Sequence, residues 1–216
     1  MRRCPLSRGV QVPDLVIIGA GGSGRELREF VRQHPFTSED VAINFLGFVD
    51  DHVEVNPEWI ATTSELGLYP GRYFLIAIAD PHTRRTLTRV AIEAGLIQAS
   101  FQHPSSIIGS DVRLGDGHII WPSVSITTNV IVGNSCHINV GVAIGHDCVL
   151  GDFVTVNPLA AISGFAHIAD EVLIGSHATI LQSLEVGPRS VVGAGSVVTR
   201  NVEPGMTVVG VPAHVQ

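Results

Sequence analysis

The sequence is poor in charge, above all in positive charge. Only 15% of its 216 residues are charged, and 20 acidic residues outnumber 13 basic ones, for a net charge of -7. Lys and Arg form no cluster, whereas binding to nucleic acid or to an anionic membrane needs concentrated positive charge. The composition therefore argues against both partners and favours small-molecule ligands. With 45% hydrophobic residues, the chain can still bury a substantial core.

The sequence also has no long apolar run, and its three cysteines are odd in number. No run reaches the roughly 20 residues of a membrane span, and the basic stretch 1–13 lacks the apolar segment of a signal peptide. We therefore expect residues 1–13 to be a flexible N-terminus and the protein to be cytoplasmic. Cys136 and Cys148 fall at positions predicted below to face a core, where a reduced thiol behaves as a small hydrophobe. Neither a disulfide nor a metal site is expected.

The pattern of the sequence changes near residue 104. Before it, apolar runs at 15–20, 43–51, 73–80 and 97–102 alternate with helical patterns at 23–33 and 81–94. Strands that alternate with helices predict parallel βαβ units, so residues 14–103 form a Rossmann-like α/β domain. After residue 104 no helix-length pattern occurs.

Residues 104–216 instead repeat with a period of six. Every sixth residue from position 108 to position 198 is a branched aliphatic, and the next position is often Gly, which we interpret as a tight corner. The fourth residue after each aliphatic is mostly small or β-branched, so each hexad has two inward positions. This predicts a solenoid of short parallel strands. The aliphatic column is Ile108, Leu114, Ile120, Ile126, Val132, Ile138, Ile144, Leu150, Val156, Ile162, Ile168, Ile174, Ile180, Val186, Val192 and Val198.

These hexads resemble the left-handed β-helix of the hexapeptide acyltransferase superfamily, in which three hexads make one triangular coil. Residues eighteen apart would then stack at the interstrand spacing of about 4.8 Å. By this rule Gly164 lies over the outward-facing His146. A bare backbone leaves room beside the imidazole and can offer an N–H to an oxygen that gains charge. The alternative is that His146 is one exposed polar residue among several.

The stretches "GHDCVLGDF", "VVGAGSVV" and "VVGVPA" resemble the NeuD/PglD-type sugar acetyltransferases, over residues 14–213. The resemblance implies acetyl-CoA as donor, His146 as general base, and Asp147 as the acid that orients it. It also implies a homotrimer with active sites between subunits. Gly164 matches the glycine whose N–H holds the thioester carbonyl. The turns that carry Ser176 and Ala194 match those along the pantetheine arm.

A second motif, G-x-G-x-x-G, follows the first strand and opens the first helix. Such a loop can cradle phosphates. Asp50 or Asp51 could bind a ribose, so an NAD-dependent oxidoreductase remains an alternative when this half of the chain is considered alone. A tight turn that binds nothing is the other alternative. In the resembling family the loop and these acids bind a nucleotide-linked amino sugar. The expected acceptor residues here are Gly19, Gly21, Gly22, Asp50 and Asp51.

The remaining acceptor residues rest on weaker matches. Thr155 stands where many members of the family carry a second histidine, and His137 lies one coil below it. We hypothesise that His137 reaches the same region. Asn139 either fills a corner, since Asn tolerates left-handed backbone, or positions the acceptor or the base, as its family match suggests.

The sequence thus predicts an acetyl-CoA-dependent acetyltransferase acting on the amino group of a nucleotide-linked amino sugar in surface-polysaccharide or glycan biosynthesis. O-acetylation of a sugar such as sialic acid is the alternative. A zinc lyase of the γ-carbonic-anhydrase type is disfavoured because the sequence has no pair of histidines five residues apart. A purely structural β-helix would not account for a His-Asp pair under a glycine.

Overall fold

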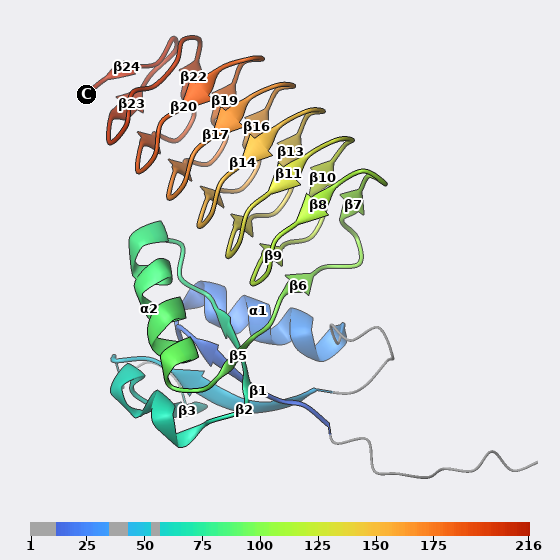
Figure 1. The fold of residues 1–216 in the computed structure, drawn as a ribbon, viewed down its shortest axis with the longest axis vertical. Coiled ribbons are helices and arrows are strands. Elements are labelled where there is room, and N and C mark those ends of the chain that lie inside the picture. The colour runs from blue at the N-terminus through green and yellow to red at the C-terminus, as the bar shows by residue number, and fades with distance from the viewer. Residues whose placement is uncertain (1–11, 35–42, 53–56) are drawn as a thin grey trace, which may run out of the picture.

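The computed structural model describes residues 12–34, 43–52 and 57–216. The segment 1–13, expected to be flexible, lies outside the described residues except for its last two positions. The described chain consists of an α/β part, followed by a long stack of coils (Figure 1).

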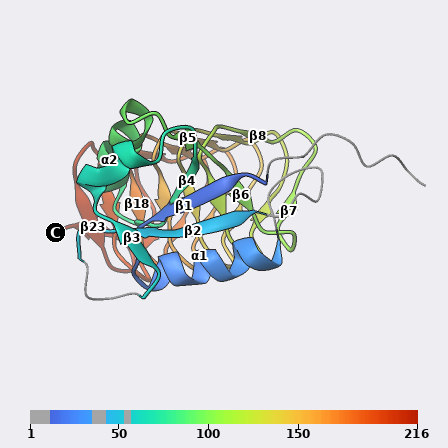
Figure 2. The same cartoon turned by 90° about the horizontal axis from the view of Figure 1, so that it is seen from below.

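The α/β part is a five-stranded parallel sheet in the order β3-β2-β1-β4-β5 with helices on both faces (Figure 2). Helix α1 begins within the glycine motif, at Gly22, and its Leu27 and Val31 are buried against the sheet. Helix α2 begins at Pro81 because Asp80 caps it, accepting a hydrogen bond from Thr83 N at 2.7 Å. The elements are β1 (Asp14–Ile18), α1 (Gly22–Gln33), β2 (Asn44–Val49), β3 (Trp59–Ala61), η2 (Thr63–Leu68), β4 (Tyr73–Ile76), α2 (Pro81–Glu93) and β5 (Ile97–Gln98).

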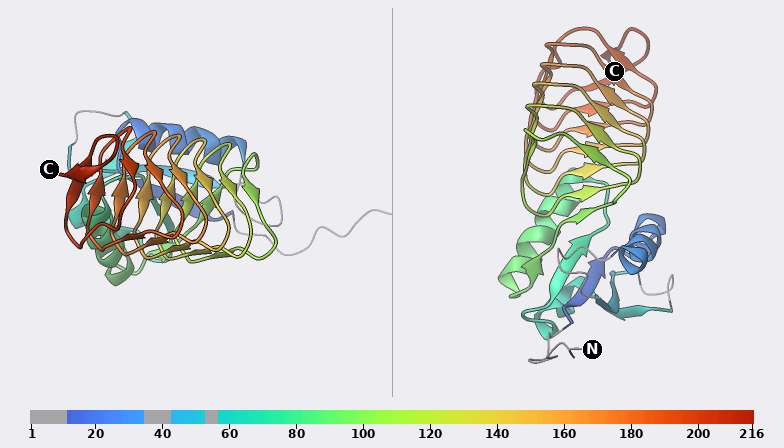
Figure 3. Two further views of the ribbon diagram at one scale, coloured as in Figure 1. Left: turned by 90° about the horizontal axis from the view of Figure 1, so that it is seen from above. Right: turned by 90° about the vertical axis from the view of Figure 1, so that its right-hand side faces the viewer.

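The coils build three sheets, and each complete coil contributes one short strand to each sheet (Figure 3). The strands pair in parallel, except that β24 is antiparallel to β23 at the end of the eight-stranded sheet. The six-stranded sheet has β7 (Ile107–Ile108), β10 (Ser125–Ile126), β13 (Ala143–Ile144), β16 (Ala161–Ile162), β19 (Thr179–Ile180) and β22 (Val197–Val198). The five-stranded sheet has β8 (Arg113–Leu114), β11 (Ile131–Val132), β14 (Val149–Leu150), β17 (His167–Ile168) and β20 (Glu185–Val186). The eight-stranded sheet has β6 (Phe101–Gln102), β9 (Ile119–Ile120), β12 (His137–Ile138), β15 (Thr155–Val156), β18 (Leu173–Ile174), β21 (Val191–Val192), β23 (Thr207–Val209) and β24 (His214–Val215).

The register confirms the eighteen-residue stacking rule. Ile126 pairs with Ile144, and Ile144 pairs in turn with Ile162. The inward positions form one continuous core along the solenoid, in which Cys136 and Cys148 are fully buried as reduced thiols. The predicted fold, a Rossmann-like domain followed by a left-handed parallel β-helix, is confirmed.

The glycines after the aliphatic column have a different cause from the corner that we predicted. Their backbone is not left-handed; the positive φ angles fall two positions later, on residues such as Asp147 (59°) and Phe165 (61°). A Cβ on Gly109 would lie 1.6 Å from Thr127 O, and one on Gly145 would lie 2.7 Å from Gly164 N. These positions exclude side chains because successive coils approach too closely there.

Candidate active site

His146 and Asp147 form the turn that joins β13 to β14, at one edge of the triangular solenoid. The His146 Nδ1 lies 2.7 Å from Asp147 Oδ2, and the side chains are 55% and 30% exposed, so a substrate could reach the imidazole. A carboxylate at Nδ1 favours the tautomer that carries its proton there and leaves the lone pair of Nε2 free. This arrangement can take a proton from an incoming nucleophile.

Asn129 is a contact of this pair that the sequence analysis missed. It lies eighteen residues before Asp147, and its Nδ2 donates to Asp147 Oδ1 at 2.5 Å. The hydrogen bonds from Asn129 and then His146 lower the pKa of Asp147. The stacking rule, applied downward from Asp147, could have found Asn129.

Gly164 lies over the imidazole, as predicted. A Cβ on Gly164 would be 2.8 Å from Cε1 and 2.9 Å from Nε2 of His146, so no side chain fits there without moving the ring. The neighbouring Phe165, 58% exposed, meets the imidazole edge to face at 5.1 Å between ring centroids. The Gly164 N–H donates to no other group of the described residues, so it is available to an external acceptor.

Ser176 and Ala194 lie on a different edge of the solenoid from His146. They stack in the turns that follow the eight-stranded sheet, where a Cβ on Gly175 would meet Ala194 N at 2.4 Å. A single chain therefore does not bring these two residues together with the His146 turn. The six-stranded sheet lies between the two edges.

Thr155 and His137 pair as neighbours on β15 and β12, and both are buried where the α/β domain meets the solenoid. The Thr155 hydroxyl donates to Ala79 O at 2.6 Å and accepts from Arg84 Nη1 at 2.9 Å. Burial and then the charge of Arg84 lower the pKa of His137 well below its ordinary value, so its ring is neutral. Asn139 donates its Nδ2 to Val156 O at 3.1 Å.

Arg84 joins the α/β domain to the solenoid, and nothing in the sequence pattern predicted this role. The side chain is 1% exposed, and burial lowers its pKa to about 10. No carboxylate within the described residues pairs with it by a hydrogen bond or ion pair. Its guanidinium instead donates to one hydroxyl and to the backbone oxygens of Ser135, Phe153, Val154, Ile78 and Ala79.

The glycine motif has the close packing that its spacing predicts. Gly19 has φ of 104°, which favours glycine. A Cβ on Gly24 would lie 2.0 Å from Gly19 O, so the helix approaches the strand this closely only because residue 24 is glycine. A Cβ on Gly21 or Gly22 would meet nothing within 4 Å. The helix N-terminus is therefore open to a ligand at these two positions.

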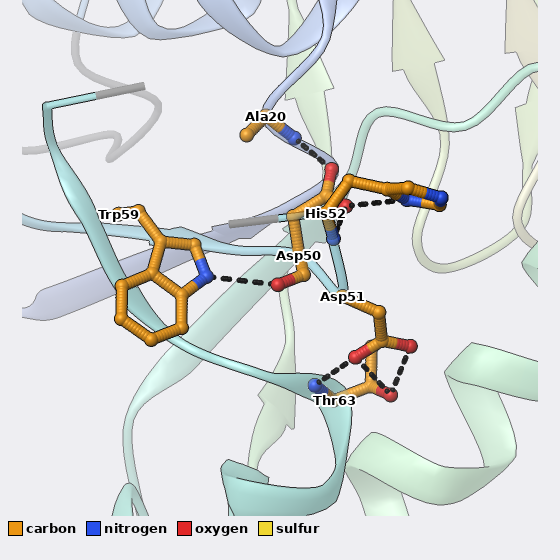
Figure 4. A network of polar contacts seen from close by, with 6 residues as sticks. All are labelled: Ala20, Asp50, Asp51, His52, Trp59 and Thr63. Atoms are coloured by element: carbon orange, nitrogen blue, oxygen red, sulfur yellow. Dashed lines mark hydrogen bonds and ion pairs between the residues drawn. The ribbon is translucent and has the colours of Figure 1, made fainter. Parts of the chain in front are cut away.

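The two acids near this loop hold the protein's own backbone (Figure 4). Asp50 accepts from Ala20 N at 2.7 Å and from His52 N at 2.9 Å. Partial burial opposes the effect, but these hydrogen bonds lower the pKa of Asp50 overall. Asp51 accepts from the backbone N–H and hydroxyl of Thr63, at the start of η2. Both acids thus shape the loop, and their contact with an acceptor stays a prediction.

Within residues 12–34, 43–52 and 57–216, no cluster of His, Cys, Asp and Glu is suited to a metal ion. No helix in these ranges is long and apolar enough to span a bilayer. A groove of about 770 Å³ between α2 and the Phe153 turn contains none of the predicted site residues. The His146 turn is an open corner, which becomes enclosed only where a second surface meets it.

Comparison with known proteins agrees with this fold. No protein-family model matches the chain. GDP-perosamine N-acetyltransferase of Escherichia coli O157:H7 is 35% identical over 119 residues, which are 52% of this chain and 53% of that protein. The aligned part therefore spans about half the length of this curated relative.

Solved structures match over almost the whole chain. WeeI from Acinetobacter baumannii AYE is 31% identical, with a TM-score of 0.84 over 95% of this chain and 100% of its own. PerB from Caulobacter crescentus, in complex with CoA and GDP-perosamine, is 26% identical, with a TM-score of 0.85 over 97% of this chain and 100% of its own. The acetyltransferase domain of PglB from Neisseria gonorrhoeae FA1090, in complex with acetyl coenzyme A, is 27% identical, with a TM-score of 0.85 over 95% of this chain and 100% of its own.

The fold and the His-Asp turn under a bare glycine define a hexapeptide-repeat acyltransferase with an N-terminal Rossmann-like domain. The chain belongs to the sugar acetyltransferases of this superfamily, the NeuD/PglD type.

Proposed function

We propose that this protein transfers the acetyl group of acetyl-CoA to the amino group of a nucleotide-linked amino sugar. The observation that carries the proposal is the reachable His146 imidazole, with Asp147 at Nδ1 and the bare Gly164 beside Nε2. Similarity to proteins solved with CoA and GDP-perosamine, or with acetyl-CoA, supports the choice of donor and acceptor. The product would serve polysaccharide or glycan assembly.

In this mechanism, Nε2 of His146 accepts a proton from the attacking amine as the new C–N bond forms. The carbonyl oxygen of the thioester gains negative charge, and the Gly164 N–H is free to donate to it. Asp147 stabilises the imidazolium through Nδ1. When the C–S bond breaks, the imidazolium returns its proton to the departing thiolate, which leaves the base ready for another cycle.

The α/β domain, which we expect to hold the acceptor, and the His146 turn lie on opposite sides of one chain, which supports a homotrimer with active sites between subunits. The α/β domain packs against the eight-stranded sheet, through Arg84 and through Ile119 and Trp121 of the first coil. His146 lies at the edge between the other two sheets. A sugar held by one α/β domain would thus meet the His146 turn of a neighbouring copy. Light scattering should give three times the 22.9 kDa of one chain.

We also place the reaction in the cytoplasm, in keeping with the buried reduced thiols of Cys136 and Cys148. The acceptor class is tested by following thiol release from acetyl-CoA with GDP-, UDP- and dTDP-linked amino sugars and with free sialic acid. We expect turnover on one nucleotide amino sugar, with the acetyl group on nitrogen by mass spectrometry. Turnover on sialic acid alone would replace N-acetylation with O-acetylation.

A further inference from the structure

Asn129 ties the turn below the candidate base to the turn that carries it. Its side chain donates to Asp147 Oδ1 at 2.5 Å, while Asp147 N donates to Thr128 O at 3.1 Å. The two oxygens of Asp147 therefore have separate partners, with Asn129 on Oδ1 and His146 Nδ1 on Oδ2. We propose that Asn129 is a positioning residue for acetyl transfer, which fixes the carboxylate of Asp147 so that Nδ1 of His146 keeps its proton. The inference rests on the proposed function.

The carboxylate needs such a partner because it is not enclosed. Asp147 is 30% exposed, so water can compete for both of its oxygens. Rotation of the carboxylate would take Oδ2 away from Nδ1 and would allow the other imidazole tautomer, which has no lone pair at Nε2. Asn129 prevents this rotation from the opposite side, much as outer partners fix the orientation of ligating histidines.

The surroundings of His146 contain few charged groups. The coil above contributes Gly164 and Phe165, neither of which is charged. The coil below contributes Asn129 and Thr128, and the Thr128 hydroxyl is 3.5 Å from Asp111, one coil further away. Among the described residues, Asp147 is thus the only charged group that contacts the imidazole. A change at Asn129 acts on His146 through Asp147.

Two substitutions separate this role from simple support of the corner. Asn129 has φ of 53°, a conformation that Gly adopts without strain, so Asn129→Gly removes the amide and keeps the turn. Asn129→Asp replaces the donor with a second carboxylate, which favours the protonated imidazole. Ser123→Gly is the matched control, because Ser123 is exposed, has φ of 59° and lies in another corner.

The experiment measures kcat and KM for acetyl-CoA, and the pH dependence of kcat/KM, for the wild type, these variants and His146→Ala. For Asn129→Gly we expect kcat to fall roughly tenfold with KM within about twofold of wild type. For Asn129→Asp, the acidic limb of the kcat/KM profile should move to higher pH by about one pH unit. Ser123→Gly should match the wild type.

Two results would overturn the inference in distinguishable ways. In the first, His146→Ala is inactive, Asn129→Gly has the kcat of the wild type, and the acidic limb of the kcat/KM profile of Asn129→Asp is unchanged. Asn129 then only supports the turn, and the proposed function stands. If His146→Ala is as active as the wild type, His146 is not the base and this inference fails with that assignment, whereas a wild type that transfers no acetyl group would overturn the proposed function.

Discussion

The Cα of Gly164 lies against the imidazole of His146, so close that an added Cβ would be 2.9 Å from Nε2. The relationship follows from the eighteen-residue coil, which places a turn of the next coil directly over the His146 turn. Glycine is therefore required at position 164 by the ring beneath it, since the backbone there is not left-handed.

Gly164→Ala should displace the imidazole and reduce kcat about 100-fold, because a misplacement of about 1 Å costs that much in an oriented site. Steady-state kinetics with acetyl-CoA and the acceptor would measure the loss. Gly67→Ala is the control, since a Cβ there meets nothing within 4 Å. Equal activity of Gly164→Ala and wild type would show that the ring position is unimportant.

Arg84→Met should lower the free energy of unfolding by about 3 kcal/mol, because buried carbonyls would lose their donor. The hydrogen bonds to Ser135 O and Phe153 O, at 2.8 and 2.7 Å, join the helix to the solenoid. Arg89→Met, on the same helix, breaks only an exposed pair with Glu93 and should cost less than about 0.5 kcal/mol. Urea unfolding at one protein concentration compares them, and equal losses would contradict the role of Arg84.

His137 should make the fold sensitive to acid. Its folded pKa lies well below 6.5, so the unfolded chain binds the proton first, and stability is full above about pH 6.5 and falls as the pH drops below it. The loss is at most about 1.4 kcal/mol for each pH unit. His137→Gln should flatten this part of the dependence. Urea unfolding of both proteins between pH 7.5 and 5.5 would test it, and parallel curves would be the contrary result.

Active sites between subunits predict complementation. Gly22→Glu places a carboxylate at an open position of the glycine loop and should block the acceptor, while His146→Ala removes the base. Each variant alone should be inactive. When the two variants are co-expressed and mix at random, about a quarter of the sites should combine an intact loop of one subunit with an intact base of its neighbour. The mixed protein should therefore regain about a quarter of the wild-type activity. No recovery would place both parts of the site in one chain.

Repetition explains how much could be predicted from the sequence. The period of six predicted the inward Cys136 and Cys148, and the resemblance to a coil of three hexads predicted the meeting of His146 with Gly164. Asn129 was within reach of the same stacking rule. Arg84 was not, because its partners lie on coils far along the chain, and only the packing of α2 against the solenoid brings them together.

The acids of the α/β domain show a different limit. Their position after β2 is where a ribose-binding acid would stand, but Asp50 is bound to Ala20 N and Asp51 to Thr63. A carboxylate at a strand end can serve the loop or a ligand, and the sequence alone does not distinguish these uses.

The most direct test of the account is turnover by His146→Ala in the thiol-release assay with the preferred acceptor. His167→Ala is the matched control, because His167 is an exposed histidine on β17, part of the five-stranded sheet. We predict a loss of about 100-fold or more for His146→Ala and none for His167→Ala. Wild-type turnover by a folded His146→Ala protein would contradict the assignment of His146 as the base.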